Sequence, residues 1–141
     1  MSNVLRMSDA ASLALHGMVL MAARRNEVLS TKDIAKVLNA SEAHLSKVLQ
    51  RLSRAGLLES VRGRTGGFAL RKSPAKTSLL EVYEAIEGRL AASTCLLGKP
   101  ICRGKKCILG KLLQMVSKET RRHLSRTKLN ELVDVFSEKK R

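Results

Sequence analysis

The stretch that decides the fold is STKDIAKVLNASEAHLSKVLQRLSRAGLLESVRGRTGGFAL, residues 30–70. Its first half predicts two short amphipathic helices, residues 31–38 and 41–54, because apolar side chains recur every three or four positions. Ser30 and Ser41 stand where N-cap residues accept hydrogen bonds from the first turn of a helix. Asn39, between the helices, tolerates the left-handed conformation that a tight turn needs. Two such helices predict a helix-turn-helix, although a plain helical hairpin fits the same pattern.

The second half of this stretch predicts a basic β-hairpin. Residues 57–61 and 67–70 are short strand-like runs. Between them the sequence RGRTGG, residues 62–67, combines three glycines with two arginines. Glycines let the backbone approach a phosphate closely, and arginines supply positive charge. An ordinary solvated hairpin would look the same in isolation. Directly after a helix-turn-helix, however, the pattern is typical of the wing of a winged helix.

Further helices are predicted on both sides of this stretch. Apolar periodicity indicates helices at residues 12–23, 78–87 and 108–126, with a further apolar repeat after Thr127. The helix at 108–126 carries one apolar stripe, which fits best against a second copy of the chain. The expected fold is mainly α with a small β-hairpin wing: a winged helix-turn-helix plus a long dimerisation helix. The expected parts are a DNA-binding domain at 1–88, a cysteine-containing loop at 89–107, and the dimerisation helix with a basic tail at 108–141.

Composition narrows the function. The 141 residues carry 27 Lys and Arg against 12 Asp and Glu, a formal net charge of +15, which favours a polyanionic partner. Aromatic residues are only 2% of the chain, too few to stack single-stranded bases, so duplex DNA is favoured. We see no apolar run long enough for a membrane span and no signal-type segment, so a cytoplasmic protein without a membrane partner is expected.

The predicted second helix of the helix-turn-helix, residues 41–54, is the candidate for the major groove of DNA. Its solvent face can offer hydrogen bonds to base edges and phosphates, and the wing can reach phosphates or the minor groove. A two-fold dimer would bind a pseudo-palindromic operator. The candidate DNA-binding residues are Ser41, His44, Ser46, Lys47, Gln50, Arg54, Arg62, Arg64 and Gly66.

The three cysteines of the chain lie together on a loop that contains glycine and proline. Cys95, Cys102 and Cys107 have the spacing C-x6-C-x4-C, which is not that of a zinc ribbon. Thiolates converging from a loop can hold an iron–sulfur cluster or zinc, but three ligands are one short of a full set. A thiol switch without metal, or thiols with no cofactor, fits the same spacing. An enzyme is not expected, because no nucleophile, base and orienting group occur together in a recognisable pattern.

At this point the motifs add up to a resemblance. Over residues 7–135 the chain resembles the Rrf-two (Rrf2) family of bacterial winged-helix transcriptional regulators, of IscR/NsrR-like type. The resemblance rests on SDA at 8–10, SEAHLSKVL at 41–49, the wing residues RG–GGF–L within 62–70, and three cysteines before a long helix. It implies a homodimer with crossing long helices. It also implies a 2Fe–2S or 4Fe–4S cluster held by Cys95, Cys102 and Cys107, and hence sensing of iron–sulfur status, nitric oxide or redox state.

The fourth ligand of such a cluster is left open by the resemblance. Gly110 stands where the IscR-like pattern has a histidine. The NsrR-like pattern uses an acidic residue near the start of the first helix, where this chain has Ser12, with Asp9 one turn earlier as a candidate. A cofactor-free thiol switch, a non-sensing architectural DNA-binding protein and a zinc-stabilised adaptor remain as alternatives.

Overall fold

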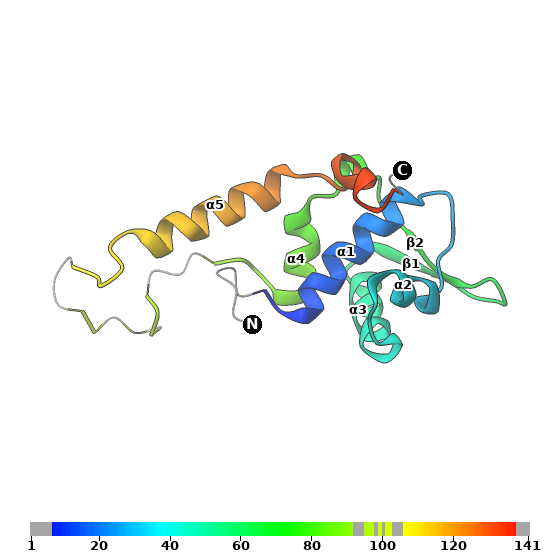
Figure 1. Ribbon diagram of the computed structural model, residues 1–141, viewed down its shortest axis with the longest axis horizontal. Coiled ribbons are helices and arrows are strands. Elements are labelled where there is room, and N and C mark those ends of the chain that lie inside the picture. Colours follow the sequence, from blue (N-terminus) through cyan, green and yellow to red (C-terminus); the bar gives the residue numbers. More distant parts are fainter. Residues whose placement is uncertain (1–6, 92–94, 98, 100, 103–105, 138–141) are drawn as a thin grey trace.

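The computed structural model describes residues 7–91, 95–97, 99, 101–102 and 106–137. Figure 1 shows α1 running through the middle of the body, with the helix-turn-helix and the hairpin on one side and α4 on the other, while α5 projects away. In chain order the elements are α1 (Asp9–Ala23), α2 (Thr31–Leu38), α3 (Glu42–Arg54), β1 (Leu58–Val61), β2 (Gly67–Leu70), η1 (Pro74–Lys76), α4 (Leu79–Glu87), α5 (Leu112–Arg126) and η2 (Leu129–Phe136). The expected fold class, mainly helical with one two-stranded wing, is confirmed. Within the described ranges, no helix is long and apolar enough to cross a bilayer.

Serine residues are the N-caps of four helices. The hydroxyl oxygens of Ser8, Ser30, Ser41 and Ser78 each accept a hydrogen bond from the backbone N–H three residues later, over 3.0 to 3.3 Å. Each bond satisfies one of the N–H groups that the first turn of a helix leaves without a partner. Asn39 ends α2 in the left-handed region, with φ 51° and ψ 49°. The predicted caps and the predicted turn of the helix-turn-helix are therefore confirmed.

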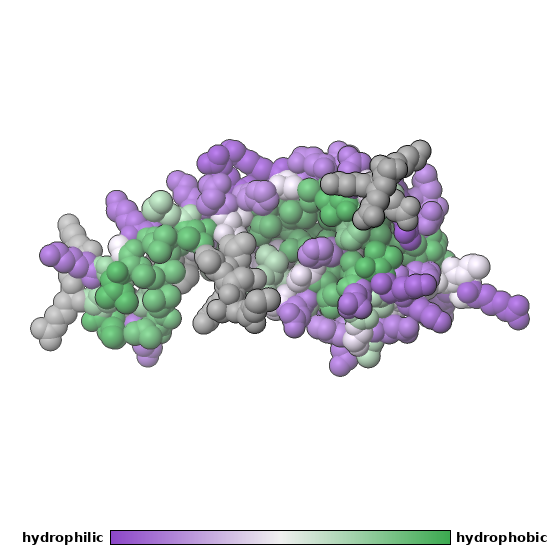
Figure 2. All heavy atoms as spheres, viewed as in Figure 1, coloured by the Kyte–Doolittle hydropathy of each residue, from purple (hydrophilic) through white to green (hydrophobic). Residues whose placement is uncertain are grey.

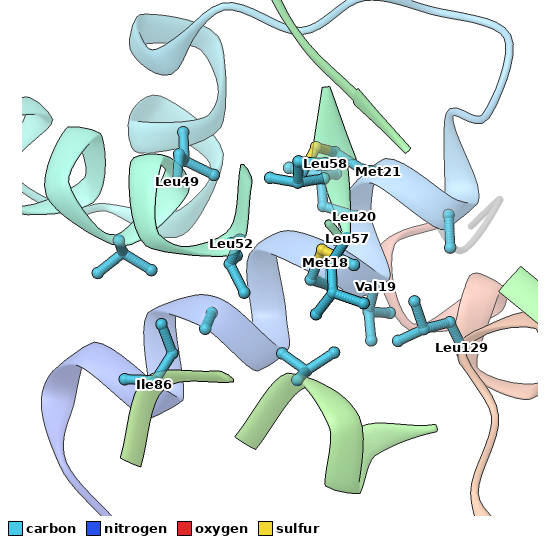
Figure 3. Packing of buried hydrophobic residues seen from close by; sticks show 14 of the residues in the cluster. Met18, Val19, Leu20, Met21, Leu49, Leu52, Leu57, Leu58, Ile86 and Leu129 are labelled. Carbon is cyan, nitrogen blue, oxygen red and sulfur yellow. The ribbon is translucent and has the colours of Figure 1, made fainter. Parts of the chain in front are cut away.

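The core forms around α1, which packs against α3, α4 and η2. Figure 3 shows Met18 and Leu20 of α1 among buried side chains from α3, the hairpin and η2. The largest fully buried side chains are Met18, Leu20, Ile34, Leu45, Leu49, Leu52, Leu58 and Leu129. Because the apolar face of α3 belongs to this core, its polar face is held in a fixed orientation toward solvent.

The hairpin is tied to the helix-turn-helix by its backbone. β1 and β2 pair antiparallel, from Leu58 opposite Leu70 to Val61 opposite Gly67. An isolated bridge joins Phe68 to Leu29, the residue just before the cap of α2. The N–H of Phe68 donates to the carbonyl of Leu29 over 2.8 Å, and the N–H of Leu29 donates back over 3.1 Å. The wing is thus fixed relative to α2 and, through it, to α3.

One expectation about the C-terminal third, the start of the long helix, is wrong. The long helix begins at Leu112 rather than at Ile108, since Gly110 has a positive φ of 58° and ends a turn. Lys111 precedes the helix without a side-chain cap. The apolar repeat after Thr127 forms a 3-10 helix, η2, that returns to pack on α1. There the N–H of Leu129 donates to the carbonyl of Thr77 over 3.0 Å.

Candidate nucleic-acid interface and cysteine segment

The exposed side of α3 carries the side chains that the sequence predicts for DNA contact. Ser41, His44, Lys47, Gln50 and Arg54 are exposed, and Ser46 is half-buried. The Gln50 amide donates to the Ser46 hydroxyl over 3.5 Å, so these two side chains can be ordered together. The apolar face of the helix is fully buried: Leu45, Val48, Leu49 and Leu52. The division into an inner and an outer face agrees with the prediction.

The wing tip presents two cations on a tight turn. Arg62, Gly63, Arg64 and Thr65 are exposed. Gly66 closes the turn, because its N–H donates to the Gly63 carbonyl over 3.0 Å. A Cβ at Gly66 would lie 2.4 Å from the carbonyl oxygen of Val61. The glycine is therefore required by the turn itself, whatever it does on DNA.

Two lysines outside the predicted set belong to the same surface. Lys32 and Lys36 of α2, with Asn39 and Glu42, line a hollow of about 330 Å³ between α2 and the start of α3. Their amines add positive charge beside the first turn of α3, where Glu42 is the acidic residue. The sequence could have identified both lysines, since helical periodicity places them on the polar side of an amphipathic helix.

Arg51 of α3 has a hydrogen-bond partner on another helix. Its guanidinium donates to the backbone carbonyl of Ile86, at the end of α4. On a helix, position 51 lies to one side of the face that Lys47, Gln50 and Arg54 share. Local sequence gave no sign of this contact, because the two residues are 35 positions apart.

In the described part of one chain, the three cysteines do not form a ligand cage. Cys95 and Cys107 are half-buried and Cys102 is exposed. The N–H of Leu109 donates to the Cys107 sulfur over 3.5 Å. Among the described residues, which include all three cysteines, no three His, Cys, Asp or Glu side chains are grouped as a metal site. Asp9 is exposed in the first turn of α1.

Large apolar residues within this segment and just after it are exposed in the single chain. Figure 2 shows them as a continuous green surface over the outer end of α5. The exposed fraction of the side chains ranges from 51% at Leu112 to 83% at Ile108, with Met115 at 64%. The other members are Leu96, Leu97 and Ile101. We call these six residues the outer apolar face.

The comparison with protein families decides the identity. A family model described as Rrf2, iron-dependent transcriptional regulator, matches residues 7–135, which is nearly the whole chain. The chain belongs to the Rrf2 family. The resemblance read from the helix-turn-helix, the wing and the cysteines is confirmed, and the homologues of this Rrf2 protein are transcriptional regulators, not enzymes.

Relatives of the Rrf2 protein include regulators named NsrR. The transcriptional regulator NsrR of Bacillus licheniformis is 32% identical over 117 residues, which cover 77% of this chain and 81% of that protein. NsrR of Geobacillus kaustophilus is 36% identical over 83 residues, 59% of this chain and 54% of that protein. The match thus spans little more than half the length of the second relative.

Solved structures share the fold of this Rrf2 chain. CymR of Bacillus subtilis, titled a global cysteine regulator, has a TM-score of 0.79 at 23% identity and covers 95% of this chain and 100% of its own. IscR of T. potens has a TM-score of 0.72 at 22% identity, with coverage of 94% and 89%. At these identities the likeness shows the fold alone.

Proposed function

We propose that this Rrf2 regulator is a homodimer that binds a specific duplex DNA sequence and adjusts its affinity to the state of three cysteines. The observation that carries the DNA-binding part is α3, whose apolar side is buried while its hydrogen-bonding side is open to solvent. A DNA-binding regulator acts where the DNA is, so the proposal includes a cytoplasmic location.

The contacts in this proposal fall into two kinds. His44, Lys47 and Gln50 face base edges in the major groove, where side-chain donors and acceptors distinguish base pairs. The remaining candidates, Ser41, Ser46, Arg54, Arg62, Arg64 and Gly66, meet phosphates or the minor groove. A non-sensing architectural protein would use the second kind of contact without the first, and would show no sequence preference.

The outer apolar face supports the homodimer. Monomeric proteins rarely leave such a group of large apolar side chains together in water, and a two-fold interface lets the same surface cover its own copy. Because α5 projects from the body (Figure 1), its outer end can reach a second copy while both copies of α3 stay free. Two recognition helices related by a two-fold axis predict a pseudo-palindromic operator.

The three cysteines have the chemistry of iron–sulfur ligands, but they are one ligand short of a full set. Cys95, Cys102 and Cys107 would hold the cluster, since thiolates are the usual ligands of such clusters. Because a single chain supplies three thiols that are not yet grouped, the fourth ligand and the grouping must come with dimerisation or loading, and Asp9 is the candidate. When bound, the cluster supplies a centre that oxidants or nitric oxide can modify.

A cofactor-free thiol switch is the second candidate for the sensing step. The exposure of Cys102 favours it, because an accessible thiol is open to oxidation. The likeness in fold to CymR also favours it, since one solved CymR structure from Staphylococcus aureus is titled an oxidized form. Anaerobic expression followed by visible absorption and iron analysis separates the two. Iron with a visible absorption band supports the cluster, and a colourless, iron-free protein after reconstitution supports the thiol switch.

The DNA-binding proposal is tested by selecting duplexes from a random-sequence pool with the wild-type protein. A recurrent pseudo-palindrome is expected, and a pool with no enriched sequence would contradict specific recognition. Arg64→Ala should then weaken binding to the selected duplex and lower the slope of log affinity against log salt by about one phosphate contact. Thr65→Ala, the exposed neighbour at the same tip, is the matched control and should leave the salt slope unchanged.

A further inference from the structure

Side chains from three elements form hydrogen bonds to one short segment, residues 86–90, where α4 ends and the chain continues toward the cysteines. From α3, the guanidinium of Arg51 donates to the carbonyl of Ile86. From α5, Nη1 of Arg121 donates to the carbonyl of Leu90 over 2.9 Å. From the start of α1, the Ser8 hydroxyl donates to the Glu87 carboxylate. These three side-chain hydrogen bonds add to the packing of α1, α3 and α5 against α4.

The segment has the geometry to transmit a displacement. Gly88 ends α4 with φ 77°, and its N–H still donates to the carbonyl of Glu84 over 2.9 Å. The Glu84 carboxylate accepts a hydrogen bond from the N–H of Leu90 over 2.8 Å, which folds residues 88–90 back onto the helix. Leu90 is therefore held to α4 at its N–H and to α5 at its carbonyl. A shift of α5 acts on Leu90 and, through it, on the last turn of α4.

Arg51 links the end of α4 to the helix that faces DNA in the proposed function. The Ile86 carbonyl is one of the last carbonyls of α4, which lack partners within the helix and sit at the negative end of its dipole. A guanidinium is a strong partner for such a group, because it keeps its charge and a fixed fork of donors. Arg51 stands on the same helix as Lys47 and Gln50, so the end of α4 and the DNA-facing side chains are joined by one rigid turn.

We propose that Arg51 is a positioning residue that couples the cysteine segment and α5 to the recognition helix through the Ile86 carbonyl. The proposal rests on the proposed function, because it assumes that α3 contacts DNA. Cys95 follows Leu90 by five positions and Cys107 precedes α5 by five, so residues 86–90 and the start of α5 flank the cysteine segment along the chain. In this proposal, a rearrangement of the cysteines acts on both flanks.

The test uses the cluster-free full chain and compares Arg121→Gln with Arg122→Gln, its exposed neighbour, whose ion pair is with Glu119 on the same helix. Arg121→Gln should speed amide hydrogen exchange in the last turn of α3. It should also change affinity for the selected duplex by about 2- to 30-fold, the usual range for residues along a coupling route. Arg122→Gln should leave both readings near wild type.

The decisive comparison repeats Arg121→Gln in an Arg51→Gln background. Both effects of the Arg121 change should then disappear, and Arg51→Lys, which keeps a cation and is less prone to unfold the chain, should retain part of them. An Arg121 effect of equal size with and without Arg51, or one no larger than that of Arg122→Gln, would overturn the proposal. If the wild type selects no duplex, the DNA-binding proposal fails, while hydrogen exchange still reports whether α3 is coupled to α5.

Discussion

Replacing Gly67 by alanine should loosen the wing from the helix-turn-helix. Gly67 begins β2 at the point where the hairpin passes the backbone between α1 and α2. A Cβ at this position would lie 2.2 Å from the carbonyl oxygen of Leu29 and 2.8 Å from the backbone nitrogen of Ser30. Both obstacles are backbone atoms, so no side-chain rotation can make room. The two segments must separate.

The size of the effect follows from the contacts that the separation removes. Ordinary van der Waals contact begins at 3.4 Å, so the Leu29 carbonyl must move by more than 1 Å. The two hydrogen bonds between Leu29 and Phe68, at 2.8 and 3.1 Å, cannot survive such a shift intact. Each contributes about 0.5–1.5 kcal/mol net, which gives a loss of about 1–3 kcal/mol. For a chain of this length the melting temperature should fall by about 4–10 °C.

The assay is urea and thermal unfolding of the two variants Gly67→Ala and Gly17→Ala against wild type. Gly17 lies inside α1, and a Cβ there would make ordinary contacts at 3.9 Å with Leu38 and 4.0 Å with Ile34. Since alanine favours a helix over glycine by about 0.5–1 kcal/mol, Gly17→Ala should stabilise the protein. A Gly67→Ala variant as stable as wild type would refute the close backbone approach on which the placement of the wing depends.

Three further outcomes are expected. Asn39→Val should lower the free energy of unfolding in urea by about 1–2 kcal/mol, because φ is 51° there and a β-branched residue is strained in that region, whereas Asn39→Gly should not. Met115→Lys should convert the proposed dimer to monomer in light scattering, since it places a charge on the outer apolar face; a persistent dimer would contradict the proposed interface. Burial, and then the carboxylates of Glu87 and Glu84, raise the pKa of Tyr83 above 10.0. Because the folded state disfavours phenolate, stability should fall as pH rises above 10.0, and phenolate absorbance of this sole tyrosine should titrate higher in the folded than in the denatured chain.

Local chemistry explains why the helix-turn-helix could be predicted. The hydroxyls of Ser30 and Ser41 accept hydrogen bonds from N–H groups three residues away. The turn between the two helices needs a left-handed residue, and Asn39 tolerates that conformation. The faces of α3 follow from helical periodicity alone, so the exposed and buried sets were predicted together. The hairpin strands were predicted to within one residue: β1 begins at Leu58, and the prediction began it at position 57.

The missed features depend on distant parts of the chain. The start of α5 was misplaced because apolar periodicity at Ile108 continues into a turn that Gly110 ends. The contact of Arg51 with the Ile86 carbonyl joins residues with no local relation, as does the bridge between Leu29 and Phe68. The ligand set of the three cysteines stays a prediction, since the described part of one chain does not group them.

The most direct test measures, anaerobically, the affinity of the wild-type protein for one selected duplex. The measurement is made before and after iron–sulfur reconstitution, and before and after thiol oxidation. The triple variant Cys95/Cys102/Cys107→Ser is measured in the same way as the control. We expect one of the two treatments to change wild-type affinity by about fivefold or more, a typical coupling between two sites, and to leave the affinity of the serine variant unchanged. Equal affinities of the wild type in all states, or a response retained by the serine variant, would contradict this expectation.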